Sequence, residues 1–231
     1  INKWHHVVMT WENDADDEIS LYVDGVLVGV STDGSGDPAA DTDDLVIGGS
    51  AATQANFDGT IDDVRIYNYA RTADEIRLDY NSGFAAKFGG SPNKDVNRGL
   101  VGYWDFEDNA GTNANDSSDQ GNDGTLTNMD DSDWVSGKAG NGGALLFDDA
   151  NSEYVQIGSA PLTTTPLTLC AWFRSDDVDV NQTVVWIGDN SANHDYRIDL
   201  VGTSGGDPVR AIARAGGTSA EASSASPFLI N

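Results

Sequence analysis

The sequence predicts an all-β fold, an antiparallel β-sandwich of the jelly-roll type with one short helix. About a dozen short stretches with strand-like composition recur along the 231 residues, and clusters of Gly, Asn and Asp separate them. Only residues 72–82 have a convincing helical pattern, and strands do not alternate with helices as they do in parallel sheets. A chain of this length can also bury a substantial hydrophobic core.

The first part of the chain, residues 1–83, reads as strands followed by a helix. Asp24-Gly25 is a favoured two-residue hairpin turn. Thr72 and Glu75 form a capping box, and Gly83 stands where a C-terminal cap glycine belongs, so the helix is expected between them. A strand is expected at residues 4–12, a hairpin at residues 18–30, and further strands at residues 45–49 and 57–68.

A connector and a second series of strands follow. Residues 84–97 are rich in Gly, Ser, Pro and Asn and are typical of a connector, and residues 98–231 return to the strand pattern. The strands expected in this part are residues 100–106, 124–128, 143–147, 153–158, 167–174, 183–188, 196–202 and 209–215.

The composition excludes several classes of partner. The formal net charge is −26, and 32 of the 38 acidic residues are Asp, which favours turns and caps. This charge repels phosphate backbones and anionic membranes, so neither nucleic acid binding nor membrane insertion is expected. Divalent cations are better partners. The single cysteine, Cys170, excludes an intrachain disulfide framework and a Cys-based zinc cluster.

Short motifs in both parts of the chain point to a known family. The second part contains Gly99-Leu-Val-Gly-Tyr-Trp-Asp-Phe-Glu107, Asp116-Ser-Ser-Asp-Gln-Gly-Asn-Asp-Gly-Thr125, Gly143-Ala-Leu-Leu-Phe-Asp148 and Leu169-Cys-Ala-Trp-Phe173. The first part contains Trp4-His-His-Val7, Leu21-Tyr-Val-Asp-Gly25, Ile47-Gly-Gly49, Gly59-Thr-Ile-Asp-Asp-Val-Arg-Ile-Tyr-Asn68 and Thr72-Ala-Asp-Glu-Ile76. Together they resemble the laminin G-like, concanavalin A-like lectin/glucanase jelly-roll modules of bacterial or archaeal surface and secreted proteins. The resemblance implies the concanavalin A-like fold.

The order of the two halves departs from the family pattern. Residues 1–83 resemble the closing half of such a module, and residues 98–231 resemble the opening half. The chain could be a circular permutant, a polymer in which halves pair between chains, or one period of a tandem array. Overlaying Ile1-Asn2 on Ile230-Asn231 gives an uninterrupted strand entry and a period two residues shorter than the chain. The hypothesis favoured by this overlay is a repetitive protein whose modules are completed across the repeat boundary.

The resemblance also implies a structural calcium ion. Related jelly rolls often hold Ca²⁺ between the first loop and the last strand, which points to Asp116, Asn122 and either Asp62 or Asp63. Carboxylate and amide oxygens are the ligands that Ca²⁺ prefers. In the alternative interpretation, Asp116 and Asn122 only shape an Asx turn, and Asp63 pairs with Arg65 or Arg71.

No catalytic constellation is evident, so an enzyme is not expected. The six Glu residues form no Glu-x-Asp-x-Glu arrangement of the kind that glucanases on this fold use. His5 and His6 are neighbours on a strand and face opposite ways, so they cannot easily bind one ion. One of them is expected to make a buried hydrogen bond.

A carbohydrate site would need an exposed aromatic side chain beside Asn or Asp. Packing in the core is the default for most of the six tryptophans, and especially for Trp4, Trp104 and Trp172. The aromatic residues that could instead supply a sugar platform are Trp11, Trp134, Trp186 and Tyr196.

The function expected from these observations is a non-catalytic structural or adhesive repeat unit of an extracellular filament, stalk or giant surface protein. Its expected partners are neighbouring copies of itself and, for the lectin alternative, glycans. Its expected location is extracellular or at the cell surface. The alternative is a carbohydrate-binding lectin module, and a more distant one is an accessory domain of a glycoside hydrolase.

Overall fold

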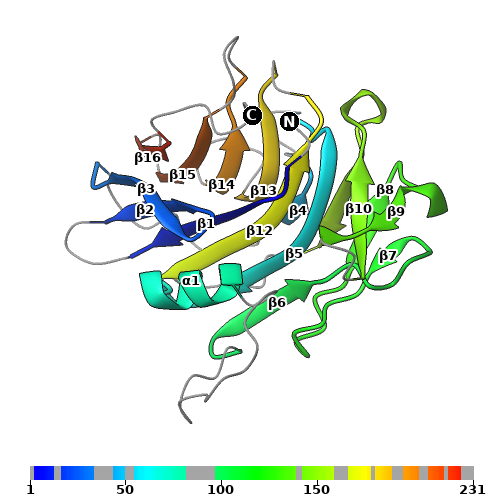
Figure 1. Cartoon of the computed structure of the whole chain (residues 1–231), viewed down its shortest axis with the longest axis horizontal. Coiled ribbons are helices and arrows are strands. Elements are labelled where there is room, and N and C mark those ends of the chain that lie inside the picture. Colours follow the sequence, from blue (N-terminus) through cyan, green and yellow to red (C-terminus); the bar gives the residue numbers. More distant parts are fainter. Residues whose placement is uncertain are drawn as a thin grey trace.

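Two antiparallel β-sheets face each other across an apolar core in the computed structural model (Figure 1). This arrangement confirms the predicted all-β, concanavalin A-like sandwich. The structure describes residues 3–12, 17–33, 44–49, 55–81, 97–138, 142–158, 166–177, 180–188, 195–202, 208–215 and 218–224.

Sheet A has the strand order β3-β2-β1-β12-β5-β10-β9, and β6 also pairs with β5. Its strands are β1 (His5–Trp11), β2 (Ile19–Val23), β3 (Val26–Ser31), β5 (Gly59–Tyr67), β6 (Leu100–Trp104), β9 (Trp134–Ser136), β10 (Gly143–Phe147) and β12 (Leu167–Ser175).

Sheet B has the order β16-β15-β14-β13-β4-β11-β8-β7. Its strands are β4 (Asp44–Ile47), β7 (Asn113–Ala114), β8 (Gly124–Thr127), β11 (Tyr154–Ile157), β13 (Gln182–Gly188), β14 (Asp195–Leu200), β15 (Val209–Ala215) and β16 (Thr218–Ser223).

One α-helix and two short 3₁₀ turns lie between the strands. The helix α1 (Ala73–Asn81) begins after the predicted capping box, in which the Thr72 N–H donates to the Glu75 carboxylate at 2.9 Å. Two 3₁₀ turns, η1 (Asp131–Asp133) and η3 (Asp149–Asn151), each begin after an Asp that caps them. Among the described residues, no helix has the length and apolarity to cross a membrane.

Strands from the two parts of the chain alternate within both sheets. In sheet A, β12 of the second part lies between β1 and β5 of the first part. In sheet B, β4 of the first part lies between β11 and β13 of the second. Six of the strand pairings among the described residues join residues 1–83 to residues 98–231. Neither part can therefore form either sheet alone.

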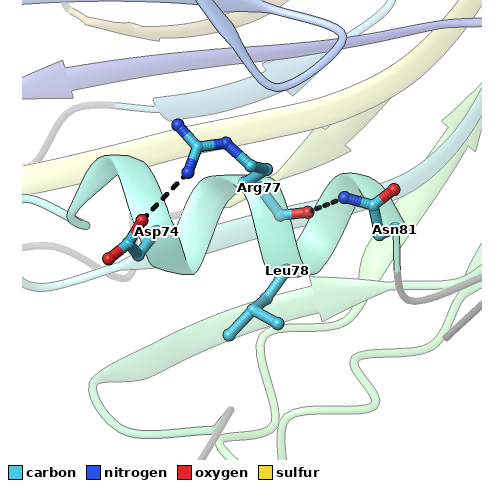
Figure 2. A pocket seen from close by; sticks show the side chains of 4 residues that line it. All are labelled: Asp74, Arg77, Leu78 and Asn81. Atoms are coloured by element: carbon cyan, nitrogen blue, oxygen red, sulfur yellow. Dashed lines mark hydrogen bonds and ion pairs between the residues drawn. The ribbon is translucent and has the colours of Figure 1, made fainter.

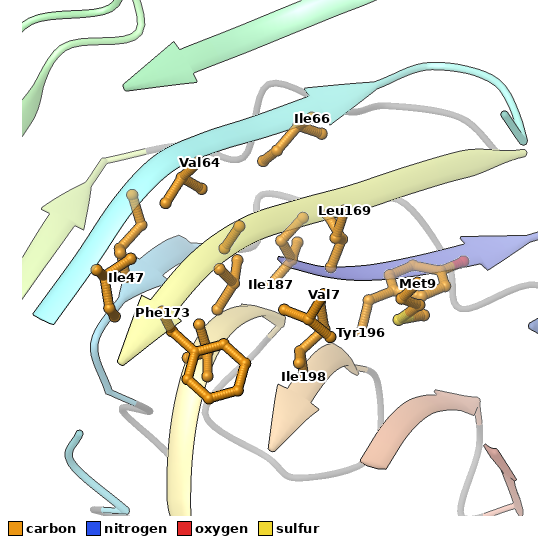
Figure 3. Close-up of a cluster of buried hydrophobic side chains, with 14 of the residues drawn as sticks. Val7, Met9, Ile47, Val64, Ile66, Leu169, Phe173, Ile187, Tyr196 and Ile198 are labelled. Carbon is orange, nitrogen blue, oxygen red and sulfur yellow. The ribbon is translucent and has the colours of Figure 1, made fainter. Parts of the chain in front are cut away.

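The core lies between the inner faces of the two sheets (Figure 3). Alternate residues of each strand point inward, so Val7 and Met9 of β1 belong to the same buried cluster as Tyr196 and Ile198 of β14. Phe57 packs edge-on against Phe173, with ring centroids 6.2 Å apart. Such aromatic contacts add to the stabilisation from burial.

The helix α1 covers part of the outer face of sheet A. Its Ile76 packs on Val8, Tyr67 and Cys170, which form a second, smaller apolar cluster. Burial raises the pKa of the Cys170 thiol to about 12, so this cysteine is an inert buried residue.

A single threonine of β12 holds the segment before α1. The Thr168 hydroxyl accepts the Arg71 N–H at 2.9 Å and donates to the Tyr69 carbonyl at 2.7 Å. Arg71 in turn forms a buried ion pair with Asp79 of α1 at 2.7 Å. The start of the helix is thus tied to a strand from the other part of the chain.

Replacing Thr168 with Val should lower the free energy of unfolding by about 1–3 kcal/mol, because the Arg71 N–H and the Tyr69 carbonyl lose their partner in a buried position. Denaturant titration measures the change. Thr168→Ser keeps the hydroxyl and is expected to lose clearly less; equal losses in both variants would mean that packing, not hydrogen bonding, is what Thr168 contributes.

Candidate functional site

The loop with the first two predicted calcium ligands is closed by its own hydrogen bonds. One oxygen of Asp116 accepts the N–H groups of Tyr103 and Ser118, and the other accepts the N–H of Asn122, each at 2.9 Å. The Asn122 side-chain amide donates to the Val101 carbonyl at 2.8 Å. Burial alone would raise the pKa of Asp116, but these hydrogen bonds hold it below its ordinary value.

The other two candidates lie at a β-bulge. The pairing of β5 with β12 shifts register at Asp63, whose φ of 52° is in the left-handed region. Asp63 accepts a hydrogen bond from Arg65 at 2.8 Å and one from the Tyr103 hydroxyl at 2.6 Å. Asp62 is buried and accepts the Lys138 N–H at 3.0 Å.

Two of the four predicted ligands contact Tyr103, one at its backbone and the other at the far end of its side chain. Its N–H contacts Asp116 and its hydroxyl contacts Asp63, while Asp62 is bonded to Lys138 instead. In the described part of the chain, no group of three or more His, Cys, Asp or Glu residues is placed to hold a metal ion. The oxygens already accept hydrogen bonds from the protein, as in the alternative interpretation. The four residues do not fit one calcium site as they stand, and the calcium site stays a prediction.

The outer face of sheet A next to α1 holds a buried aromatic and charged cluster. Trp172 of β12 stacks on Tyr80 of α1, with centroids 5.6 Å apart, and the Lys138 ammonium nitrogen lies 3.1 Å from the centroid of the Trp172 ring. His6 of β1 packs on the same tryptophan at 5.0 Å. These contacts enclose Trp172 from three sides, and it is only 5% exposed.

Two titratable groups beside this cluster have strongly shifted pKa values. Burial, together with the nearby Arg65 guanidinium, lowers the pKa of His6 to about 3. Burial also raises the pKa of Asp62 to about 7, despite the hydrogen bond from Lys138. His6 is thus neutral at any physiological pH. The expected buried hydrogen bond is made by His5, whose Nδ1 lies 2.9 Å from the Asp24 carboxylate.

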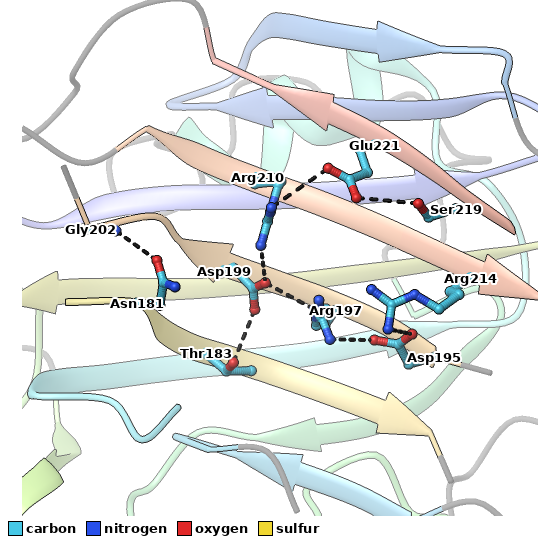
Figure 4. A network of polar contacts seen from close by, with 10 residues as sticks. All are labelled: Asn181, Thr183, Asp195, Arg197, Asp199, Gly202, Arg210, Arg214, Ser219 and Glu221. Atoms are coloured by element: carbon cyan, nitrogen blue, oxygen red, sulfur yellow. Dashed lines mark hydrogen bonds and ion pairs between the residues drawn. The ribbon is translucent and has the colours of Figure 1, made fainter. Parts of the chain in front are cut away.

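The outer face of sheet B carries a network of ion pairs (Figure 4). On β14, Arg197 lies between Asp195 and Asp199 and pairs with both, at 2.8 and 2.9 Å. Arg210 of β15 joins Asp199 at 3.1 Å, and Arg214 joins Asp195 at 3.6 Å. The network continues to Glu221 on β16, and Thr183 donates to Asp199.

This network was not predicted from the sequence, although a signal was present. Asp195 and Asp199 are four residues apart, as are Arg210 and Arg214, and the strand register places each Asp directly opposite one Arg. Both carboxylates bind the same Arg197 guanidinium, and each also pairs with a second arginine on β15.

The predicted sugar platforms are mostly wrong. Trp11 and Trp186 are each 1% exposed and Tyr196 is 6% exposed, because all three lie within the sandwich or on a covered sheet face. Trp134 is half-buried, packs against the core and donates its indole N–H to the Gly111 carbonyl. Among the described residues, no aromatic side chain reaches full exposure. The core assignment is confirmed for Trp104, whereas Trp172 is buried on the outer face of sheet A and not in the core. Trp4 is only half-buried.

His194 and the short acidic stretches at 13–16 and 41–43 lie outside the described residues. A shallow pocket on α1 is lined by Asp74, Arg77, Leu78 and Asn81 (Figure 2). Asp74 and Arg77 form an ion pair with each other there, so both charged side chains that line this pocket are already paired.

Comparison with known proteins gives a family for the first third of the chain. Residues 1–77 match the family model described as the concanavalin A-like lectin/glucanases superfamily. This segment is similar to laminin G-like modules. No curated protein and no solved structure matches the chain. The match confirms the resemblance where it applies, and the sandwich agrees with it over the rest of the chain.

Replacing Asp62 with Asn should stabilise the protein at pH 8. The pKa of Asp62 is about 7 in the folded chain against an ordinary value of 3.8, so the folded state binds the proton more tightly. The contribution of Asp62 to the free energy of unfolding is therefore fully present below pH 4 and is lost as the pH rises through 7. The variant should gain on the order of 2–4 kcal/mol at pH 8 and nothing near pH 3. Denaturant titration at both pH values measures this gain.

Asp119→Asn is the matched control, because Asp119 is exposed and the same charge is removed. An equal gain in both variants at pH 8 would mean that net charge, rather than the burial of Asp62, is responsible.

Calcium is tested by melting the protein with EDTA and with added Ca²⁺. Because the Asp116 oxygens already accept three backbone N–H groups, we expect EDTA to leave the melting temperature unchanged, and Asp116→Ala to lower it equally in both buffers. A fall of several degrees in EDTA that Ca²⁺ reverses, and that Asp116→Ala abolishes, would establish the calcium site instead.

Proposed function

We propose that the chain is a non-catalytic structural or adhesive repeat unit of an extracellular filament, stalk or giant surface protein. In this proposal each sandwich is completed across a repeat boundary, with residues 98–231 of one period pairing with residues 1–83 of the next. Its partners are then neighbouring copies of the same unit.

The observation that carries the proposal is the alternation of strands from the two parts. β12 pairs with β1 along seven residues and with β5 on its other side. β4 inserts between β11 and β13 in the same way. Such a joint is held by two sheets of backbone hydrogen bonds, so it transmits load along strands rather than through a flexible linker.

The same pairings can form within one chain or between periods. In this structure both parts belong to one chain, and residues 82–96, which include most of the connector, lie outside the described residues. A segment that is exchanged between copies makes the same contacts as one that is not. The reversed order of the halves favours exchange, since a continuous module would run from residues 98–231 into residues 1–83.

A non-catalytic role agrees with the arrangement of carboxylates. Asp195 and Asp199 are both paired with Arg197, and each is paired with a second arginine as well, so both are tied up in ion pairs. The superfamily contains both lectins and glucanases by its description, so the match alone does not separate these roles. The carbohydrate-binding alternative lacks an exposed aromatic platform among the described residues.

A disulfide between β1 and β12 distinguishes pairing within one period from pairing across the repeat boundary. Val8 lies directly opposite Cys170, the only cysteine, and paired residues of antiparallel strands are close enough for a disulfide. In a chain of two periods, Val8→Cys is placed in the second period, and Cys170 is kept only in the first. We expect this chain to form a disulfide during oxidative folding, which mass spectrometry detects as protection of both thiols from alkylation.

The matched control keeps Val8→Cys in the second period and leaves Cys170 only there. It should retain two free thiols, because its β1 pairs with the first period. A disulfide in the control and free thiols in the first chain would mean that each period closes on itself, and the repeat-boundary proposal would fail.

A further inference from the structure

The two parts of the chain both carry a large negative charge. Residues 1–83 contain 17 acidic and 4 basic residues, for a net charge of −13, and residues 98–231 contain 20 acidic and 6 basic residues, for a net charge of −14. The joint, made of the six described strand pairings between these parts, therefore holds two bodies of like charge together. Repulsion opposes such a contact unless ion pairs across it offset the repulsion.

The ion pairs between described residues lie within one part or the other. In residues 1–83 they join three arginines to carboxylates of the same part, and His5 contacts Asp24 there. In residues 98–231 they form the network of β14, β15 and β16. The contacts that cross the joint are mainly backbone hydrogen bonds and buried apolar side chains. The joint thus depends on interactions that salt does not screen.

Carboxylates of the two parts meet at Asp58, just before β5. The Asp58 carbonyl accepts the Asp176 N–H at 3.0 Å, and the Asp58 N–H donates to the Gln182 side chain at 3.0 Å, so this residue of the first part is bonded to the second part on both sides. Burial raises the pKa of the Asp58 carboxyl. Four carboxylates raise it further, and all belong to the second part: Asp149, Asp176, Asp148 and Asp177.

Lys138 provides an attraction across the joint, but a limited one. The carboxylates of Asp63, Asp62 and Asp24 favour its charged form, while burial has the larger effect and lowers the pKa of the ammonium. This ammonium packs on the ring of Trp172 and forms no ion pair with a described carboxylate. One such cation does not offset the like charges of the two parts.

We propose that ionic strength controls the joint, which tightens in concentrated salt and loosens in dilute salt. Salt screens the repulsion between the parts, because the Debye length falls from about 30 Å at 0.01 M to about 3 Å at 1 M. The apolar contacts that hold the joint are not screened. A joint made by ion pairs would show the opposite dependence. The inference holds whether the two parts belong to one period or to two, so it is independent of the repeat-boundary proposal.

Urea titration of the full chain from about 10 mM to about 1 M NaCl tests the proposal, since urea is uncharged and leaves the ionic strength free to vary. We expect the urea midpoint to rise by at least about 1 M over this range. Cys170 reports on the joint without urea, because its buried thiol lies on β12 between β1 and β5 of the first part. Its alkylation should be at least about tenfold faster at the lowest salt than at the highest.

Three matched variants separate the joint from the rest of the acidic surface. Asp58→Asn and Asp176→Asn each remove one carboxylate from the place where the two parts meet, so each should raise the midpoint at low salt and flatten its dependence on NaCl. At low salt the double variant should gain less than the sum of the single variants, because both relieve the same repulsion. Asp119→Asn removes the same charge from an exposed position in the Asp116 loop and should change both quantities clearly less.

A urea midpoint and a Cys170 alkylation rate that do not depend on NaCl would overturn the proposal. Equal effects of Asp119→Asn and Asp58→Asn would overturn it as well, because the repulsion would then belong to the whole surface and not to the joint. Asp176→Asn, at an exposed position, carries the comparison with Asp119→Asn in case Asp58→Asn does not fold.

Discussion

The structure depends on the mutual insertion of strands from the two parts of the chain. With β12 placed between β1 and β5, and β4 between β11 and β13, each sheet is continuous only when both parts are present. The core follows from this, because its two walls are the inner faces of sheets that neither part can build alone. The helix α1 and its tether to Thr168 depend on the same insertion, since the helix belongs to one part and the threonine to the other.

The charges are distributed according to the same architecture. Acidic residues occupy loops and caps, where Asp116, Asp130 and Asp148 accept backbone N–H groups in turns. The strands of sheet B instead carry arginines that are matched to carboxylates across the register. A chain with so large a negative charge can still form a sandwich, because the repulsion falls mainly on solvated loops while the charges on the sheet are paired.

Local signals in the sequence predicted local structure well. The Asp24-Gly25 turn has both residues at positive φ, and the Thr72–Glu75 capping box begins α1 as expected. Features that depend on distant partners were missed. The bulge at Asp63 arises where β5 meets β12, about a hundred residues away, and the burial of Trp186 depends on what covers its sheet face. Likewise, β16 is built from small and polar residues that show no strand pattern.

The order in which a ribosome makes the chain has a consequence for which strands meet. Val8 pairs with Cys170, which is added about 160 residues later, so at roughly 5–20 residues per second β1 waits on the order of ten seconds or more for β12 of its own period. In a protein with several periods, β12 of the preceding period is already made when β1 emerges. Synthesis from the N-terminus thus gives the earlier period the first opportunity to capture β1.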